Sequence, residues 1–145
     1  MGLFDDANFD KADPNKGNSG KYVEPGLHKF KVLRHKYLEE SDAFVAEFET
    51  LASQGVDGGQ PPHAVGSIVS YFVGNKVKGM AEANRAEIKR YVAAVLGVPP
   101  DQVTAKVANG TTTEEGQDLI VGKIVECEAW QNKGGTYTKK TFTSA

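Results

Sequence analysis

The stretch VKGMAEANRAEIKRYVAAVLG (77–97) decides the fold, because its apolar residues repeat with the period of a helix. The repeat follows the pattern i, i+3, i+4, i+7, at Ile88, Tyr91, Val92 and Val95. This spacing predicts an amphipathic helix of roughly five turns. Gly97 suits the left-handed conformation that ends a helix, and the Pro99-Pro100 pair prevents continuation.

Three segments before this helix are predicted to be strands. LHKFKVLRHKY (27–37) and AFVAEFETL (43–51) alternate between apolar and polar residues, and such a period of two indicates a strand with one buried side. The short polar link between them predicts an antiparallel pair. After a long loop rich in Gly and Pro, GSIVSYFVGN (66–75) has the β-branched and aromatic composition of a third strand. The phenylalanines of the first two strands are predicted core residues: Phe30, Phe44 and Phe48.

Two more strands follow the helix. The polar stretch NGTTTEEGQD (109–118) precedes LIVGKIVECEAWQ (119–131), and the turn NKGG (132–135) leads into TYTKKTFTS (136–144), which together predict a hairpin. Gly122, inside the first of these strands, predicts a bulge or sharp bend and leaves the register of the two faces open. The predicted inward residues are Val121, Val125, Cys127 and Ala129, and the predicted outward residues are Ile124, Glu126, Glu128 and Trp130.

The order of the predicted elements is three strands, one helix and two strands. That order predicts a mainly β protein with one long helix, built as a five-stranded Greek-key barrel of the OB-fold type, in which the helix closes one end. A length of 145 residues is typical of a single domain. Residues 1–21 contain seven Asp or Asn and few large apolar residues, so we expect a flexible acidic tail before a domain at 22–145.

The composition excludes several classes of protein. With 39% hydrophobic and 25% charged residues the chain is not wholly disordered. No apolar run approaches the about 18 residues of a membrane-spanning helix. The N-terminus lacks the basic and apolar regions of a signal peptide. A single cysteine, Cys127, excludes an internal disulfide and fits a reducing compartment, so we expect a cytoplasmic protein.

Charge is segregated along the chain although the net charge is only −2. Residues 27–36 carry +4 and residues 37–60 carry −6, while residues 66–97 and 119–145 carry +3 and +2. Local patches set the field that a ligand meets. The pattern therefore permits a polyanionic ligand but does not require one, since such runs are also typical of solvated faces.

Candidate catalytic and metal-binding groups are few. His28 and His35 lie seven residues apart on one predicted strand, which places them on opposite faces. No spacing of Cys and His is typical of a transition-metal site. Glu47 with Glu49, and likewise Glu126 with Glu128, share a strand face, and solvated faces explain these pairs more simply than Mg²⁺ ligands do. We therefore expect no enzymatic activity, no metal and no cofactor.

A protein that binds single-stranded nucleic acid needs a basic groove and exposed aromatic rings on which bases stack. The last hairpin offers both, with Trp130 predicted to be exposed beside Lys133 and with Tyr137 and Lys139 on one face of the final strand. Tyr71 and Phe72 are alternatives on the third strand. The complete set of candidate nucleic-acid-binding residues is Lys29, Lys31, Tyr71, Phe72, Lys76, Lys123, Trp130, Lys133, Tyr137, Lys139 and Lys140.

The segment GKIVECEAWQNKGGTYTKKTF (122–142) resembles the final hairpin of phage OB-fold single-stranded-DNA-binding proteins, in which a basic, glycine-rich turn joins two long strands. YVEPGLHKFKVL (22–33) and GSIVSYFVGNK (66–76) are similar too. The resemblance implies a protein that coats single strands during replication, recombination or repair, with little sequence preference and no cofactor. Many such proteins end in an acidic tail with an aromatic residue. Here the acidic-aromatic segment is LFDDANFD (3–10), a hypothetical recruiter of replication proteins or competitor of DNA.

The main alternative is a phage-encoded β-barrel that binds proteins, in a structural or host-inhibitory role, because OB-like barrels support many functions. A nuclease is a more distant alternative, which would need its acidic residues clustered in a pocket. The sequence leaves open whether the protein forms homo-oligomers.

Overall fold

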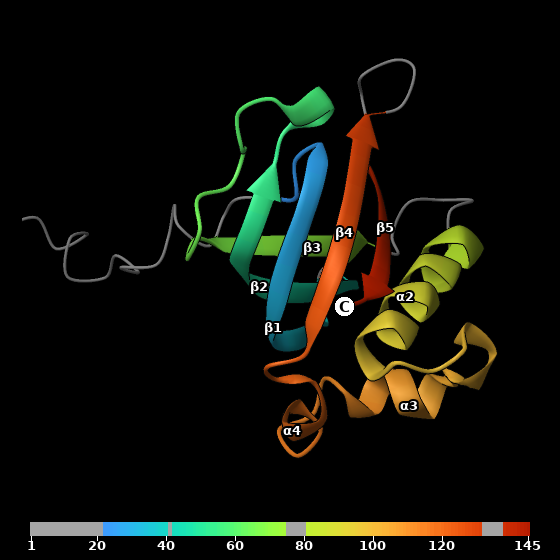
Figure 1. Ribbon diagram of the computed structural model, residues 1–145. Coiled ribbons are helices and arrows are strands. Elements are labelled where there is room, and N and C mark those ends of the chain that lie inside the picture. The colour runs from blue at the N-terminus through green and yellow to red at the C-terminus, as the bar shows by residue number, and fades with distance from the viewer. Residues whose placement is uncertain (1–21, 41, 75–80, 132–137) are drawn as a thin grey trace, which may run out of the picture.

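The computed structural model describes residues 22–40, 42–74, 81–131 and 138–145 (Figure 1). These residues form one five-stranded sheet and a small number of helices. The strands are β1 (Gly26–Leu38), β2 (Ala43–Gln54), β3 (Ile68–Gly74), β4 (Ile124–Gln131) and β5 (Thr138–Ser144). The α-helices are α2 (Ala81–Leu96), α3 (Ala105–Gly110) and α4 (Gln117–Ile120), and short 3₁₀ turns occupy Val56–Gly58 and Pro100–Gln102.

The strands are hydrogen-bonded in the order β3-β2-β1-β4-β5, and every neighbouring pair is antiparallel. This arrangement confirms the predicted pairing of the first two strands and the predicted final hairpin, whose turn at 132–135 lies outside the described residues. Figure 1 shows β3 running crosswise to β1 and β4, so the sheet is strongly curled. Within the described ranges no ladder joins β3 to β5, and the sheet is open between them.

One face of the sheet forms the core, as the alternation predicts. Phe30, Phe44 and Phe48 are buried, and the rings of Phe30 and Phe48 stack with centroids 4.9 Å apart. On β4 the predicted inward residues Val125, Cys127 and Ala129 are also buried. Val121 is exposed instead, because it precedes the strand.

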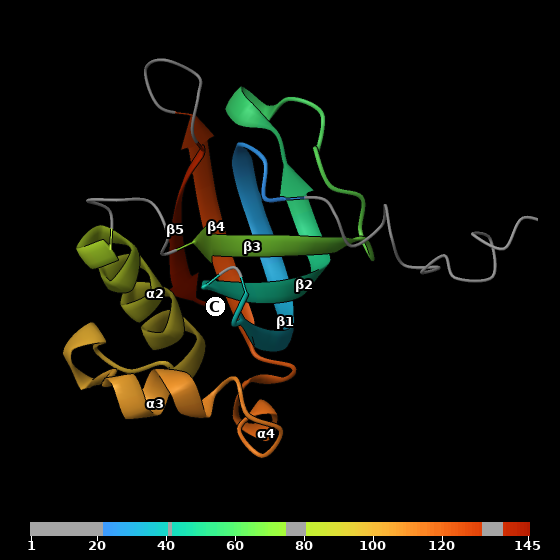
Figure 2. The same cartoon turned by 180° about the vertical axis from the view of Figure 1, so that it is seen from behind.

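The long helix α2 packs beside β5 (Figure 2). Tyr91, Val92 and Val95 are buried and Ile88 is partly buried, which confirms the predicted apolar face over 81–96. Gly97 has φ +70°, the left-handed conformation expected after a helix. Among the described residues, no helix combines the length and the apolar character needed to cross a membrane.

An irregularity in β1 overturns the prediction that its two histidines face opposite sides. The register with β2 shifts between Val32 and Arg34, so Leu33 is an extra residue and the alternation reverses there. His28 and His35 are consequently both buried, at 4% and 1% exposure. Because Leu33 is an extra residue, His28 and His35 lie on the same face of β1 although they are seven residues apart in sequence.

The connection between α2 and β4 differs from the sequence prediction. The polar stretch 109–118, for which the sequence predicts neither a helix nor a strand, contains the end of α3 and the start of α4. The prediction that Gly122 lies inside a strand is wrong, because β4 begins only at Ile124. Gly122 has φ +85° in the turn after α4, and its N–H donates to the carbonyl of Val32. Its left-handed conformation therefore turns the chain into the strand.

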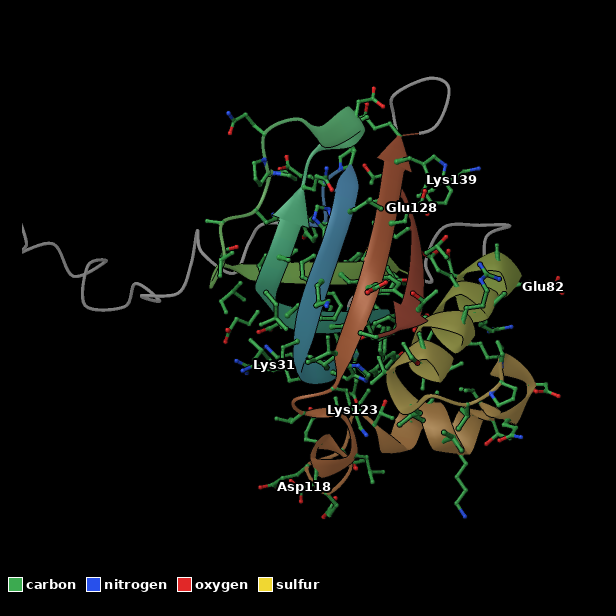
Figure 3. All side chains as sticks on the ribbon, viewed as in Figure 1. Lys31, Glu82, Asp118, Lys123, Glu128 and Lys139 are labelled. Carbon is green, nitrogen blue, oxygen red and sulfur yellow. The ribbon has the colours of Figure 1, made fainter. Side chains whose placement is uncertain are left out.

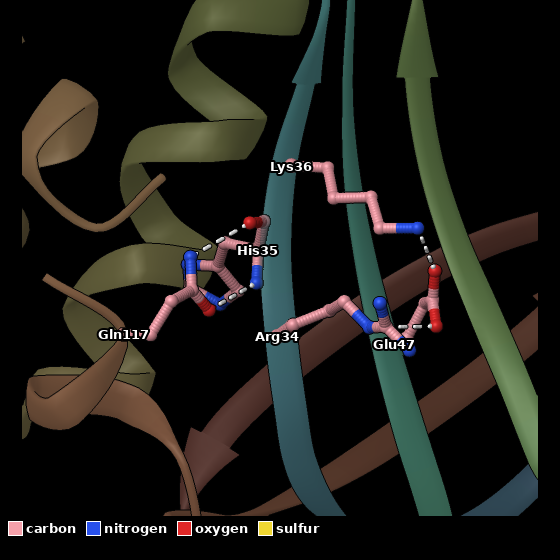
Figure 4. Close-up of polar contacts among 5 residues, drawn as sticks. All are labelled: Arg34, His35, Lys36, Glu47 and Gln117. Carbon is pink, nitrogen blue, oxygen red and sulfur yellow. Dashed lines mark hydrogen bonds and ion pairs between the residues drawn. The ribbon is translucent and has the colours of Figure 1, made fainter. Parts of the chain in front are cut away.

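The Gln117 side chain fastens this connection to β1 (Figure 4). Its carbonyl oxygen Oε1 accepts from the backbone N–H of His35 at 3.1 Å, and its Nε2 donates to the backbone carbonyl of His35 at 2.9 Å. The His35 ring contacts the hydroxyls of Tyr91 on α2 and Thr111, at 2.8 and 3.1 Å. β4 does not pair with β1 at His35, and the Gln117 side chain makes the hydrogen bonds there that a neighbouring strand would make. The His35 ring connects the sheet to α2 through the hydroxyl of Tyr91.

Candidate nucleic-acid interface

The end of β4 presents the single tryptophan of the chain to solvent. Trp130 is 42% exposed and points outward, as its place in the alternation predicts. Its register partner on β5 is Lys139, which is also exposed. Partners across an antiparallel pair lie about 5 Å apart at Cβ. The final hairpin therefore places a base-sized aromatic surface next to a cation.

Trp130 and Lys139 stand at the edge of a cleft of about 440 Å³. Four elements surround the cleft: β3, residues 83–91 of α2, the end of β4 and residues 139–142 of β5. Its lining residues are Tyr71, Ala83, Asn84, Glu87, Arg90, Tyr91, Trp130, Lys139, Lys140, Thr141 and Phe142. The cleft therefore lies on the side where the curled sheet is open.

Three aromatic rings form the apolar floor of the cleft. Phe142 lies with its ring centroid 4.8 Å from those of both Tyr71 and Tyr91, and the two tyrosine rings are 5.1 Å apart. The Tyr71 side chain has 0% exposure. The prediction that Tyr71 offers an exposed stacking surface is therefore wrong, because this strand position faces the core and the next one faces solvent.

A carboxylate and an ammonium group stand over this floor. The Tyr71 hydroxyl donates to Oε1 of Glu87 at 2.8 Å. The Lys140 ammonium lies 5.6 Å from the centre of the Tyr71 ring, in cation–π geometry. Burial lowers the pKa of Lys140, and the negative charge of Glu87 partly opposes that shift. The Glu87 carboxylate, a hydrogen-bond acceptor, and the Lys140 ammonium, a cation, therefore both contact the Tyr71 side chain in the floor.

Arg90 is a cleft residue that the sequence analysis did not select. It is exposed on α2, one helical turn after Glu87, and forms no ion pair with any described residue. The helical period places Arg90 on the polar side of α2, but it does not show that β5 borders that side. With Lys139, it gives the rim of the cleft two cations.

The basic run of β1 is largely neutralised by the acidic run of β2. Lys31 pairs with Glu49 at 3.6 Å, and Arg34 and Lys36 both pair with Glu47, at 3.1 and 2.8 Å (Figure 4). Opposite charges that alternate along adjacent strands meet across the ladder. The predicted site residue Lys31 is therefore engaged within the protein and lies outside the cleft.

Two other predicted lysines also lie away from the cleft. Lys29 is exposed on the outer face of β1, where its register partner on β4 is Glu126. Glu126 is four residues from Trp130, which is about 13 Å along a strand. Lys123 precedes the start of β4, and Figure 3 shows it at the opposite end of the β4–β5 pair from Lys139. The structure thus brings together Trp130, Lys139 and Lys140, but not Lys29, Lys31 or Lys123.

Phe72 belongs to a second exposed aromatic surface, on the outer side of β3. Its ring packs edge-to-face against Tyr22 with centroids 6.5 Å apart, and both residues are exposed. Tyr22 was not selected from the sequence, because only the bridge between Tyr22 and Ser70 brings it beside β3. The remaining predicted residues Lys76, Lys133 and Tyr137 lie outside the described residues.

In the part of the chain that the structure describes, no three His, Cys, Asp or Glu side chains are arranged to hold a metal ion. Burial raises the pKa of the Cys127 thiol to about 12, so this cysteine is protonated at neutral pH and is a poor nucleophile.

Comparison with known proteins does not assign the chain to a family. No family model matches the sequence, and the search of curated proteins gave no significant match.

Proposed function

We propose that this protein is a non-catalytic single-stranded-DNA-binding protein. The observation that carries the proposal is the cleft beside the final hairpin, where Trp130 is exposed next to Lys139 and Arg90. Proteins that bind single strands combine aromatic stacking platforms with cations that follow the phosphates. This rim offers one platform and two cations within a single concave site.

The geometry favours single strands over duplex. A stacking ring such as Trp130 needs a base whose face is free, and bases in a duplex are already stacked on their neighbours. The cleft is concave and bordered by a helix, so it suits one splayed base better than the convex surface of a double helix. The Tyr22–Phe72 pair would give a second stacking surface for a strand that follows the curled sheet.

We further infer that the sheet is an OB-fold-like barrel that is open on one side. Its strand order, with β1 between β2 and β4 and a helix between β3 and β4, supports this assignment. The ring contact between Tyr71 on β3 and Phe142 on β5 brings the two ends of the sheet together without a ladder. OB-folds commonly bind oligonucleotides.

The proposed role is to coat and protect transient single strands during phage DNA replication, recombination or repair, in the cytoplasm of the host. Binding there would be largely independent of sequence, since stacking and phosphate contacts do not select bases. Recruitment of replication proteins by the segment 3–10 remains part of the proposal and lies outside the described residues.

The experiment is a fluorescence-anisotropy titration with labelled oligo-dT, run beside a duplex of equal length over a range of salt. We expect oligo-dT to bind more tightly than duplex and to weaken as salt rises. Quenching of Trp130, the only tryptophan, would report stacking directly. Trp130→Ala should cost ~1–3 kcal/mol of binding free energy.

The matched controls separate the cleft from general charge. Lys139→Ala and Lys106→Ala each remove one exposed lysine, but Lys106 lies on α3, away from the cleft. The proposal requires a larger loss of affinity for the first variant. Absence of oligo-dT binding at low salt would rule the proposal out and leave the protein-binding barrel as the better explanation.

A further inference from the structure

A second hollow, the α2–α3 groove, lies on a different face of α2 from the cleft. It is bordered by α2, by α3 and by the ends of β1 and β2. Its volume of about 530 Å³ falls within the range of about 300–1,000 Å³ that is typical of binding sites. No residue that lines the groove also lines the cleft beside Trp130. The groove is therefore a separate site.

The apolar surface of the groove is open to a ligand. The ring of Tyr37 is 49% exposed, while its hydroxyl donates to the carboxylate of Asp42. The other accessible apolar residues of the lining, exposed or half-buried, are Ala86, Ile88, Ala105 and Ala108. Apolar surface that is left open in a concave site is typical of a place where another chain segment binds.

Two cations of α2 stand along this apolar surface. Arg85 and Lys89 are exposed, and neither forms an ion pair with a residue that the structure describes. Like charges four residues apart on a helix repel each other, so an anionic group bound between them would stabilise the helix. Within the described ranges Glu82 is the one acidic residue of the lining. The groove therefore suits an apolar segment that carries negative charge.

The chain contains a segment with this chemistry, LFDDANFD (3–10). Its apolar residues Leu3, Phe4 and Phe9 stand beside three aspartates, and it has no lysine or arginine. Complementary charge favours the correct partner over others and fixes the position in which it binds. The segment and the groove are thus complementary in both apolar character and charge.

The start of the domain brings this segment within reach of the groove. Tyr22 bridges to Ser70 on β3, and Val73 of the same strand pairs with Phe44, which lies beneath the groove. From the dimensions of a sheet, Tyr22 lies within about 20 Å of Phe44. The eleven residues 11–21 that precede Tyr22 can span up to about 36 Å. The connection is therefore long enough.

We propose that segment 3–10 binds in the α2–α3 groove of its own chain, with its aromatic rings on the apolar surface and its aspartates beside Arg85 and Lys89. A short linker gives the segment an effective concentration on the order of millimolar at the groove, which favours it over dilute segments of similar chemistry. A partner protein that recognises segment 3–10 would have to displace it from the groove. The inference does not depend on DNA binding, because the groove and the cleft share no residue.

The test places a nitroxide spin label at residue 2 of the full-length chain, through Gly2→Cys, and records ¹⁵N NMR spectra. Cys127 does not react with the label, because it is buried and burial raises the pKa of its thiol to about 12. The amides of Arg85, Ala86 and Ala108 should lose most of their intensity until the label is reduced. The turn Val56–Gly58 lies at the opposite end of the molecule from α3 (Figures 1 and 2), and its amides should keep their intensity.

Charge reversal assigns the effect to the groove. Arg85→Glu with Lys89→Glu should restore the intensity of the groove amides, because the reversed side chains repel the aspartates. Lys29→Glu with Lys123→Glu changes the net charge by the same amount at two exposed lysines outside the groove, and the intensity loss should persist. The spectra themselves establish that each variant is folded.

The segment side of the contact is tested in the same way. Asp5→Lys with Asp6→Lys, added to the reversed groove, should bring the intensity loss back, since the charges are opposite again. Phe4→Ser with Phe9→Ser, in the natural groove, should abolish the loss, because the apolar contact is removed. Added salt should weaken the contact with the natural charges.

A mixture of ¹⁵N-labelled chain without the spin label and spin-labelled chain without ¹⁵N separates the possible occupants. We expect no intensity loss in the mixture, because each segment binds its own chain. Loss at the groove in the mixture alone would overturn the proposal and make the groove an interface between two copies. No loss at the groove at low salt, or a loss that survives Arg85→Glu with Lys89→Glu, would also overturn it and leave the groove to another partner.

Discussion

Acidification from pH 7 to pH 5 should destabilise the protein through one buried histidine, His35. Burial lowers the pKa of His35 from 6.5 to about 3 in the folded protein. In the unfolded chain the imidazole takes up a proton below its ordinary pKa, while the folded form stays neutral. The stabilisation is therefore complete above pH 6.5 and is lost progressively as the pH falls towards 3.

The size of the effect follows from this difference in pKa. Each pH unit below the unfolded value costs about 1.4 kcal/mol of unfolding free energy. Between pH 7 and pH 5 the loss from His35 is about 2 kcal/mol, a large share of the roughly 5–15 kcal/mol that stabilises a typical domain.

The hydrogen bonds of the ring explain why the neutral form is preferred. The Thr111 hydroxyl donates to the carbonyl of Ala108 at 2.7 Å, so it can only accept from Nδ1–H of His35. Nε2 must then accept from the hydroxyl of Tyr91 at 2.8 Å. One neutral tautomer satisfies every partner, and a second proton would bring a charge into a site with 1% exposure.

Urea unfolding at pH 7, 6 and 5 measures the effect. Most carboxylates stay ionised over this range, so histidines dominate the slope. His35→Gln should be less stable than the natural protein at pH 7 but should lose about 2 kcal/mol less on going to pH 5. Burial also lowers the pKa of His28, so His28 contributes to the same pH dependence. The variant His28→Gln measures how much of the slope comes from His28. An equal loss of stability in the natural protein and in His35→Gln would refute the reasoning.

Three further predictions concern the framework and the cleft. Gln117→Met leaves the backbone groups of His35 without their partners, so unfolding free energy should fall by about 1–3 kcal/mol in urea titrations; an unchanged midpoint would contradict the assigned role. Gly26→Ala should lower the melting temperature, because Gly26 has φ +142° and an added Cβ would lie 2.1 Å from the carbonyl oxygen of Gln54; scanning calorimetry would detect it. Lys139→Ala should reduce the slope of log K against log salt by ~0.7 for oligo-dT, whereas Lys106→Ala should not.

Most of the framework could be predicted from the sequence because each element follows its own periodicity. Phe30 and Phe48 alternate with charged residues. A strand with one buried side accommodates both, because the phenylalanines then face the core and the charged side chains face water. Tyr91, Val92 and Val95 follow the helical period for the same reason. The hairpin could be recognised from its glycine-bearing turn, and with it the outward position of Trp130.

Features that depend on contacts between distant segments could not be predicted. No residue type near Leu33 marks the register shift of β1, since a bulge is set by both neighbouring strands. The polar stretch around Gln117 contains no helical repeat of apolar residues. Hydrogen bonds between the Gln117 side chain and the backbone of His35 hold it in place instead. The sequence therefore predicted neither α3 nor α4.

Only part of the candidate site could be predicted, because the rest depends on contacts between distant segments. Trp130, Lys139 and Lys140 are close in sequence, and alternation alone placed them on the hairpin. Arg90 comes from α2, and no local pattern shows which side of that helix borders β5. Tyr71 and its neighbour Phe72 are equally aromatic, and only the pairing with β2 decides which of them is buried.

If single strands bind in the cleft as proposed, the opening of the sheet between β3 and β5 affects the lifetime of the protein. A strand bound in the cleft would touch both ends of the sheet and α2 at once, so its binding free energy would add to the stability of the fold. At a ligand concentration about 100 times the dissociation constant this gain is about 2.7 kcal/mol. Molecules without DNA would unfold more often and be degraded sooner, because proteases act on the unfolded fraction. The abundance of the protein would then follow the supply of single strands, without any dedicated regulator.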